Sequence, residues 1–199
     1  MNVTTAMNCV AVGYQALKSI ATESYNVAVG ANALRSASTG SGGNTALGNA
    51  ALYHLTTSSD YNVGVGGLAL YTATSSSNNN VAVGYRALFT ATGSSNSASG
   101  YYSLHDTTTG THNTAIGRES GRVNTTGNYN TYLGNAADAD ANNFSKSTAI
   151  GYQSRITKSD QIVLGKSSTP PEVYIPGYVG IGKTSPSYKL EVLGDVYFH

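Results

Sequence analysis

The chain has 199 residues and a formal net charge of +1 at pH 7, and only 11% of its residues are charged. Its lysines and arginines are scattered singly and offer no basic stripe for a phosphate backbone, so we exclude nucleic acid as a partner. Its single cysteine excludes an intrachain disulfide. No run of residues approaches the ~18 apolar positions that a membrane span needs, so we expect no membrane insertion.

A short motif recurs along the chain and is clearest at residues 80–88, which read Asn-Val-Ala-Val-Gly-Tyr-Arg-Ala-Leu. The motif glycine returns in steps of 14 to 18 residues from Gly13 to Gly165, and once more at Gly182. Asparagine stands four positions before most of these glycines, and alanine stands two positions before. The residues that we assign to the structural repeat are Asn26, Ala28, Gly30, Asn44, Ala46, Gly48, Asn62, Gly66, Asn80, Ala82, Gly84, Asn96, Ala98, Gly100, Asn113, Ala115, Gly117, Asn130, Gly134, Ala149 and Gly151.

A rung of about 17 residues is too short for a pair of helices. It predicts one coil of a parallel β-solenoid, in which each coil lays two short strands beside those of the preceding coil. We therefore predict an all-β fold in which residues 1–165 form a solenoid of about ten rungs. The motif asparagines should stack along the rod and bond to one another or to the backbone.

Residues alternate between the two faces of a strand, which divides the motif into two sets. Asparagine, alanine and glycine fall on one face, and the two valine-type residues fall on the other. We expect the bulky face to fill the interior of the coil and the alanine and glycine face to pack closely against a partner chain. The pattern thus predicts an oligomer without fixing the number of chains.

Departures from the motif mark places where we expect the repeat to be weak. Gly64 and Tyr132 replace the alanine, and Gly121, Asp138 and Arg155 replace the leucine that follows the motif glycine by four positions. We predict that the solenoid narrows or changes shape beyond about residue 135.

The chain after the repeats differs in character. Residues 166–177 contain three prolines and suit an extended connector, and residues 178–199 form a separate β segment. Residues 177–184 match the phosphate-binding pattern G-x-x-x-x-G-K-[ST]. Pro186 and the strand-like alternation of residues 188–192 argue against the helix that such a site requires. We therefore predict no nucleotide and no other cofactor.

The repeats NVAVGYRAL (80–88), NTALGNAAL (44–52) and NTAIGRES (113–120) resemble those of trimeric autotransporter adhesin heads and of similar heads in phage tail fibres. The resemblance covers roughly residues 9–165. It implies a left-handed parallel β-roll in each chain, three chains around one axis, and a role in adhesion. Residues 179–192 resemble the segment that precedes a C-terminal self-cleaving chaperone domain in many tail fibres and tailspikes.

Residues with the potential for chemistry are few. The four histidines lie far apart without cysteines or carboxylates at ligand spacing, so we expect solvated loop histidines. Asp138 and Asp140 could offer oxygens to Ca²⁺, but they lack the glycine-hinged loop and bidentate glutamate of such sites, and we favour a solvated turn. No serine, histidine and acid form a nucleophile motif. We predict no catalytic residue, no metal site and no enzyme activity.

Four tyrosines directly follow motif glycines, namely Tyr14, Tyr85, Tyr101 and Tyr152. Exposed rings on a repetitive rod can stack on sugars or proteins, which makes these residues weak candidates for receptor binding. We favour the alternative interpretation, in which the rings pack over neighbouring rungs or between chains.

These observations together predict a structural and adhesive fibre protein: a homotrimeric phage tail-fibre segment of the virion, in contact with other fibre or baseplate proteins. It would bind a host cell-surface glycan or protein by multivalent, non-catalytic contacts, and we expect the polar connectors to carry them because loops lie outside the core. These connectors are residues 36–43, 56–60, 72–79, 91–95 and 105–112. The alternatives are a fragment of a bacterial trimeric adhesin on the cell surface and a purely structural fibre spacer.

Overall fold

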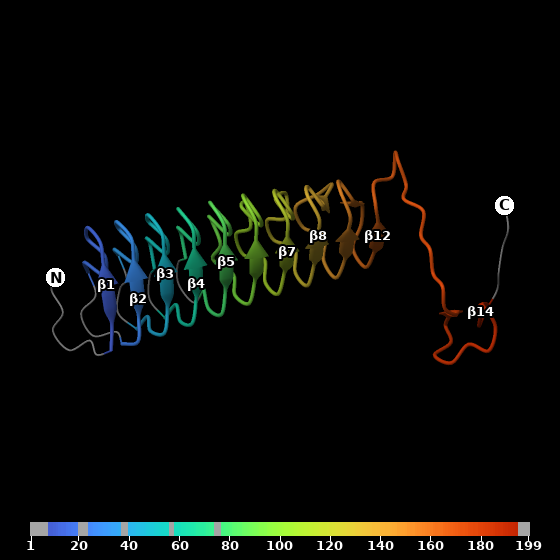
Figure 1. Ribbon diagram of the computed structural model, residues 1–199, viewed down its shortest axis with the longest axis horizontal. Coiled ribbons are helices and arrows are strands. Elements are labelled where there is room, and N and C mark those ends of the chain that lie inside the picture. The colour runs from blue at the N-terminus through green and yellow to red at the C-terminus, as the bar shows by residue number, and fades with distance from the viewer. Residues whose placement is uncertain (1–7, 20–23, 37–39, 56–57, 74–76, 195–199) are drawn as a thin grey trace.

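The computed structural model describes residues 8–19, 24–36, 40–55, 58–73 and 77–194, and its repeats form an elongated rod (Figure 1). The rod is a parallel β-solenoid of about eight turns, and its main sheet contains ten strands. The described residues contain no helix, and hence none long and apolar enough to cross a membrane. The predicted all-β parallel solenoid is confirmed.

Each strand of the main sheet consists of the three residues before a motif glycine. Every strand pairs in parallel with the next, and the motif positions stay in register, so that Ala28 lies opposite Ala46. The register of the sheet is therefore the alignment of the sequence repeats. The ten strands are β1 (Val10–Val12), β2 (Val27–Val29), β3 (Thr45–Leu47), β4 (Val63–Val65), β5 (Val81–Val83), β6 (Ser97–Ser99), β7 (Thr114–Ile116), β8 (Thr131–Leu133), β10 (Thr148–Ile150) and β12 (Ile162–Leu164).

The alanine side of each strand faces the interior of the coil, and the valine side faces outward. Ala82 is fully buried, whereas Val81 and Val83 on either side of it are 38% and 40% exposed. The prediction that the bulky face fills the interior is therefore wrong. A leucine from the facing segment already occupies that space: a Cβ placed at Gly64, at the alanine position, would lie 3.3 Å from Leu52 Cγ. Only a small side chain fits between strand and leucine.

The segment after the motif glycine is a stack of tight turns in most coils. Asn32 and Leu34 have φ values of 60° and 47°, in the left-handed region that regular strands do not use. Backbone bonds still join successive coils, for example from Leu34 N–H to the Ala51 carbonyl at 3.0 Å. The predicted second strand is therefore wrong for these coils. It forms only late in the chain, where β9 (Asp138–Ala139) pairs in parallel with β11 (Arg155–Ile156).

The core of the solenoid lies between the strand alanines and the turn leucines. Holding a leucine in the left-handed region costs about 1–3 kcal/mol, and fully burying its side chain contributes a similar ~1.5–3 kcal/mol. Burial of the side chain can thus hold the turn in its strained conformation. The fully buried leucines at this position are Leu17, Leu34, Leu52, Leu70, Leu88 and Leu104.

The buried motif asparagines form a hydrogen-bonded ladder along the rod. Asn62 Oδ1 accepts from the backbone N–H of Asn80 at 3.0 Å and from Asn80 Nδ2 at 3.2 Å. Its own Nδ2 donates to the Ser77 carbonyl at 2.7 Å. The predicted asparagine stacking is confirmed. Backbone N–H to Oδ1 bonds join each step through Asn26, Asn44, Asn62, Asn80, Asn96, Asn113, Asn130 and Ser147.

The connectors between coils form part of the solenoid wall. Ser41, Ser59 and Ser77 are fully buried, and the Ser59 carbonyl accepts from Asn44 Nδ2 at 2.9 Å. The prediction that connectors lie outside the core is therefore wrong for these residues. Connector residues 37–39, 56–57 and 74–76 lie outside the described residues.

The motif glycine is required by the close stacking of coils. Gly84 has a φ of +133°, which other residues rarely adopt, and a Cβ there would lie 2.5 Å from the Gly100 carbonyl oxygen. Side chains are thus excluded on both conformational and steric grounds. The same combination holds at Gly13, Gly30, Gly48, Gly66, Gly100, Gly117 and Gly134.

Two departures from the motif compensate for each other near the predicted change of shape. Gly121 lacks the leucine of the preceding turns, and Tyr132 fills the space: a Cβ placed at Gly121 would lie 2.6 Å from Tyr132 Cδ2. Tyr132 is fully buried although it stands at an alanine position. The prediction of a change of shape beyond about residue 135 agrees with the appearance of β9 directly after this coil.

The chain beyond β12 leaves the rod (Figure 1). Residues 166–177 contain none of the strands, and β13 (Val179–Ile181) pairs in parallel with β14 (Leu190–Val192). Within the described residues no helix follows Thr184, so residues 177–184 do not form the cradle that phosphate-binding loops provide.

The pairing of Gly121 with Tyr132 predicts strong coupling between their substitutions. Tyr132→Ala should destabilise the chain by about 3–5 kcal/mol through an unfilled cavity, and Gly121→Leu by about 1–3 kcal/mol through overpacking. The double variant restores the alanine and leucine of the regular rungs, provided that the end of the Leu104 side chain, 2.7 Å from the new Cβ, moves aside. Leu104, at the equivalent position of the preceding coil, has a φ of 48° against 61° at Gly121, so leucine tolerates this backbone conformation. In urea denaturation, the double variant should lose at least ~2 kcal/mol less free energy of unfolding than the two single variants lose together. Additive losses would contradict the compensation.

Candidate functional site

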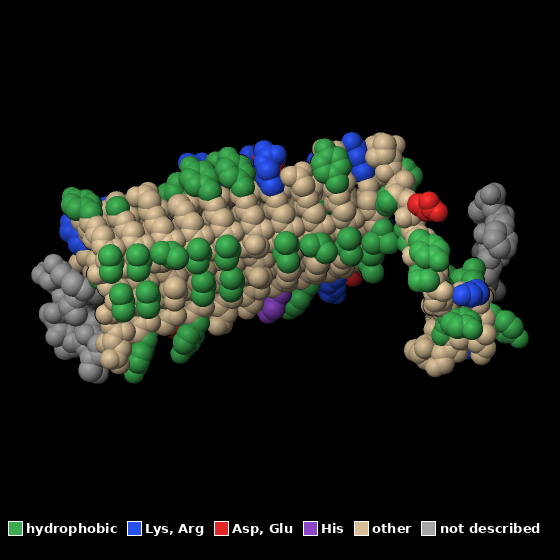
Figure 2. Space-filling view, viewed as in Figure 1, with side chains coloured by type: hydrophobic (Ala, Val, Ile, Leu, Met, Phe, Trp, Pro, Cys, Tyr) green, Lys and Arg blue, Asp and Glu red, His purple; other side chains and the backbone are tan. Residues whose placement is uncertain are grey.

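The outward side chains of the main sheet form two rows along the rod, which we call the apolar strand face (Figure 2). The serines of β6 interrupt both rows. The row that begins with Val10 also carries threonine in β3, β7, β8 and β10, so that only the row that begins with Val12 is apolar over most of the later coils. Long exposed apolar surfaces are uncommon on monomeric proteins and mark contact sites. The large apolar residues of this face with at least 37% exposure are Val10, Val12, Leu47, Val81, Val83, Ile116, Leu133, Ile150, Ile162 and Leu164.

This arrangement moves the expected interface to the opposite side of the strand. The sequence pattern assigned the partner contact to the alanine and glycine face, but that face is covered by leucines of its own chain. Within the described residues, the valine side has no equivalent cover. The uncovered apolar surface on which we expect a partner chain to pack is therefore the apolar strand face.

The turn side of the coil carries a stack of aromatic rings, the aromatic row, which consists of Tyr53, Tyr71, Phe89 and His105. The ring centroids of successive members lie 5.2, 5.1 and 5.2 Å apart, and all three pairs are stacked. The Arg35 guanidinium lies 5.4 Å from the Tyr53 centroid. Such pairs contribute ~0.5–1.5 kcal/mol each beyond burial. The ring faces are thus largely used within the protein.

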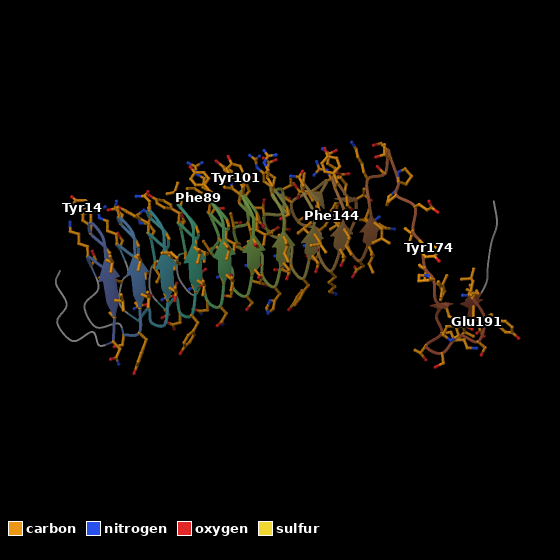
Figure 3. All side chains as sticks on the ribbon, in the orientation of Figure 1. Tyr14, Phe89, Tyr101, Phe144, Tyr174 and Glu191 are labelled. Atoms are coloured by element: carbon orange, nitrogen blue, oxygen red, sulfur yellow. The ribbon has the colours of Figure 1, made fainter. Side chains whose placement is uncertain are left out.

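The four tyrosines singled out in the sequence fall into two groups. Tyr101, which is labelled in Figure 3, stacks on Tyr85 with ring centroids 5.7 Å apart, and the Arg118 guanidinium lies 5.7 Å from the Tyr101 centroid. Packing between neighbouring rungs, the favoured interpretation, is found for this pair. Tyr14 and Tyr152, in the first and one of the last coils, are 70% and 62% exposed. They keep a free ring surface for a partner.

A recess of about 630 Å³ opens on the turn side of the later coils. We call it the charged recess, and its charged residues are Asp106, Glu119, Arg122, Asp138, Arg155 and Lys166. It forms where the turn leucines end, since Asp138 and Arg155 stand at leucine positions. Sequence reasoning missed this site. The available signal was the loss of the leucine in three consecutive rungs together with charged residues after the motif glycine.

Asp138 is the most strongly perturbed group of the recess. It is only 5% exposed, and its Oδ1 accepts from the Val123 and Ala139 N–H groups at 3.1 and 2.9 Å. Burial raises the pKa of Asp138 to about 6, although these bonds and the Arg155 guanidinium oppose the shift. Burial also raises the pKa of Tyr132, whose buried hydroxyl has no hydrogen-bond partner. The predicted solvated turn is wrong for Asp138.

The arrangement around Arg155 argues against a calcium site. Arg155 Nη1 lies 3.4 Å from Asp138 Oδ2, and its Nε lies 3.6 Å from Asp140 Oδ1. A cation is therefore already supplied by the protein between the two carboxylates. Among the described residues, no group of three or more His, Cys, Asp or Glu side chains is placed to hold a metal ion.

His105 differs from the solvated loop histidine that the sequence suggested. Its side chain is only 14% exposed, and Nδ1 lies 2.6 Å from Asp106 Oδ1. Its ring is also stacked on Tyr102 with centroids 4.5 Å apart. His105 thus links the aromatic row to the charged recess.

The comparisons with known proteins give no match: no family model, no curated protein and no solved structure is similar to this chain. Function must therefore be inferred from the rod and its surfaces.

The raised pKa of Asp138 predicts a stability that falls as pH rises. Between the ordinary aspartate value of 3.8 and about 6, the folded chain retains a proton that the unfolded chain has lost. Folding stability should therefore decrease across this window by on the order of 2–3 kcal/mol. Asp138→Asn removes the titrating group and should remove this decrease.

The measurement is urea denaturation at intervals from pH 3.5 to 7.5, with Asp160→Asn as a control on an exposed acid. The difference in stability between the parent chain and Asp138→Asn should change with pH, and Asp160→Asn should follow the parent. Parallel curves for the parent and Asp138→Asn would contradict the assignment.

Proposed function

We propose that this chain is a structural and adhesive segment of a trimeric fibre, most simply a phage tail-fibre component of the virion that contacts the host cell surface. The observation that carries the proposal is the apolar strand face. It follows the sheet from β1 to β12 and is uncovered in the single chain. A rod with one apolar side along its length suits lateral association with copies of itself.

Association through this face accounts for features that a monomer leaves unexplained. Valine, leucine and isoleucine recur on the outward side of the strands, and copies arranged around an axis parallel to the rod could bury them against one another. The number of chains and the left-handed coil are taken from the resemblance of the repeats to trimeric adhesin and tail-fibre heads. The ends of such a rod are where other fibre or baseplate proteins would join.

Adhesion is the role that fits the other side of the coil. The turn side carries the exposed rings of Tyr14 and Tyr152 and the charged recess, and it remains open when the strand side is covered. Copies of one site, repeated around an axis, can raise avidity by about 10²–10⁴ without any tight single site. The partner would be a host surface glycan or protein, bound without catalysis.

A structural spacer is the second candidate. It is favoured by the aromatic row, because its ring faces stack on one another and are therefore not available to a partner. A fragment of a bacterial surface adhesin would share the same assembly. Cell binding separates the spacer from the adhesive roles, and the identity of neighbouring genes, baseplate or outer-membrane anchor, separates phage from bacterial origin.

The assembly is tested by placing a charge on the apolar strand face. Leu47 is 48% exposed in the single chain, so Leu47→Lys should leave the coil intact while placing an unpaired charge in the interface. Analytical ultracentrifugation should show a trimer for the parent chain and smaller species for the variant. Asn49→Lys, two residues away on the turn side, adds the same charge and should remain trimeric. A parent chain that is monomeric at micromolar concentration, or a trimeric Leu47→Lys, would overturn the interface.

Adhesion is tested with the same variants on whole host cells. The labelled parent trimer and Asn49→Lys should bind, and Leu47→Lys should bind at least ~100-fold more weakly because avidity is lost. Equal binding by dissociated Leu47→Lys would contradict multivalency. A trimer that binds no cells across candidate hosts would favour the spacer.

A further inference from the structure

We propose that the charged recess is a binding site for a sugar residue that carries an anionic substituent. The inference rests on the proposed adhesive function in one respect: such a sugar would belong to the host surface glycan. The recess itself is argued from its own geometry and tested separately below.

The recess is assembled from segments of five successive coils. Each coil contributes the residues that directly follow its motif glycine or strand, from Asp106 after β6 to Lys166 after β12. In the preceding coils this part of the turn contains a buried leucine. Asp138 and Arg155 stand at the leucine position in the later coils and line the recess, which makes this part of the turn side charged. The charged recess is therefore specific to the later coils.

The acidic groups of the recess already have partners. The carboxylate of Asp138 is held by two backbone N–H groups and Arg155, as described above. Glu119 Oε1 lies 2.7 Å from Arg118 Nη2, and Asp106 lies 2.6 Å from His105 Nδ1. The acceptors that line the recess are thus satisfied by the protein, and a cationic or donor-rich ligand would have to displace these contacts.

Apart from Arg155, which is paired with Asp138, and Arg122, which is only loosely paired, the donors of the recess remain open. Within the described residues, the Lys166 ammonium, the Gln153 side-chain amide and the Ser167 hydroxyl form no hydrogen bond or ion pair. Arg122 meets Asp106 only at 3.7 Å through Nε, and its guanidinium otherwise lies 5.5 Å from the Tyr102 centroid. Open cationic donors bind carboxylate and phosphate groups best. This asymmetry between donors and acceptors selects an anionic ligand.

The size and walls of the recess select a sugar over a bare ion. A volume of about 630 Å³ lies within the ~300–1,000 Å³ of small-ligand sites. Val123 and Ala136 line it with apolar surface suited to a sugar ring, and Gln153 and Ser167 can serve ring hydroxyls. The recess lies on the turn side, and none of its lining residues belongs to the apolar strand face.

The test is a titration of the intact oligomer at pH 7.5 with four probes: methyl glucuronide, glucose 6-phosphate, neutral methyl glucoside and inorganic phosphate. Binding is followed by chemical-shift changes and calorimetry. We expect millimolar binding of at least one anionic sugar, and binding of the neutral sugar and of free phosphate at least about tenfold weaker. Lys166→Ala and Arg122→Gln should each lower the affinity for the anionic sugar by about tenfold, since each removes a charged donor.

Lys158→Ala is the matched control, because it removes the same charge from an exposed lysine outside the recess. It should change the affinity less than twofold. Equal losses of affinity in all three variants would show that the effect comes from net charge and would contradict the site. Free phosphate that binds as tightly as the sugars would show that the ligand need not be a sugar. If neither anionic sugar binds, the recess is not a binding site.

The two proposals can fail separately. Anionic sugar binding that depends on Lys166, without any binding to cells, would support the recess and count against the adhesive function. Cell binding by the parent trimer that survives Lys166→Ala would support adhesion and show that the recess is not its site. Glucuronide and sugar phosphate, where only one binds, identify the anionic substituent.

Discussion

The asparagine ladder is the interaction on which the rest of the rod depends. Each ladder asparagine is buried and accepts the backbone N–H of the next ladder residue. It also donates its amide to a connector carbonyl, as Asn113 does to the Gly127 carbonyl at 2.8 Å. One side chain thus fixes both the register of the strands and the path of the connector. Replacing it would leave a buried N–H and a buried carbonyl unpaired, at ~1–3 kcal/mol each. A buried amide at this position is therefore a requirement of the coil.

The narrow interior of each coil decides which side chains point outward. At Gly64, which takes the alanine position, even a Cβ would lie 3.3 Å from Leu52 Cγ. The turn leucine and the strand alanine therefore already fill the interior. Larger aliphatic residues of the strand have no place inside and must point outward. The apolar strand face is thus a consequence of a narrow interior.

The sequence repeat was sufficient to predict the solenoid, the strands of its main sheet and their register, because a fixed period admits few other folds. The second strand that we expected in each coil is absent from most of the described coils. The repeat could not decide which strand face is buried, since alternation is equally satisfied either way and the answer depends on Leu52 and its equivalents across the coil. The left-handed turns were equally hidden, because nothing in Ala-Leu signals φ near 50°. Nor does the sequence alone show that Gly121 and Tyr132 compensate for each other, because they lie in different coils and meet only in the folded rod. The charged recess was missed for the same reason.

A regular repeat and its departures contribute differently to function. Identical rungs produce identical surfaces, so the regular coils can offer a partner only a continuous face, as the apolar strand face does, or a repeated stack, as the aromatic row does. A concave site requires that neighbouring rungs differ. Two of the departures expected to be weak places, Asp138 and Arg155, line the charged recess, where a carboxylate is buried beside an arginine. At the third, Gly121, Tyr132 supplies the lost core volume, so the core stays filled next to the recess.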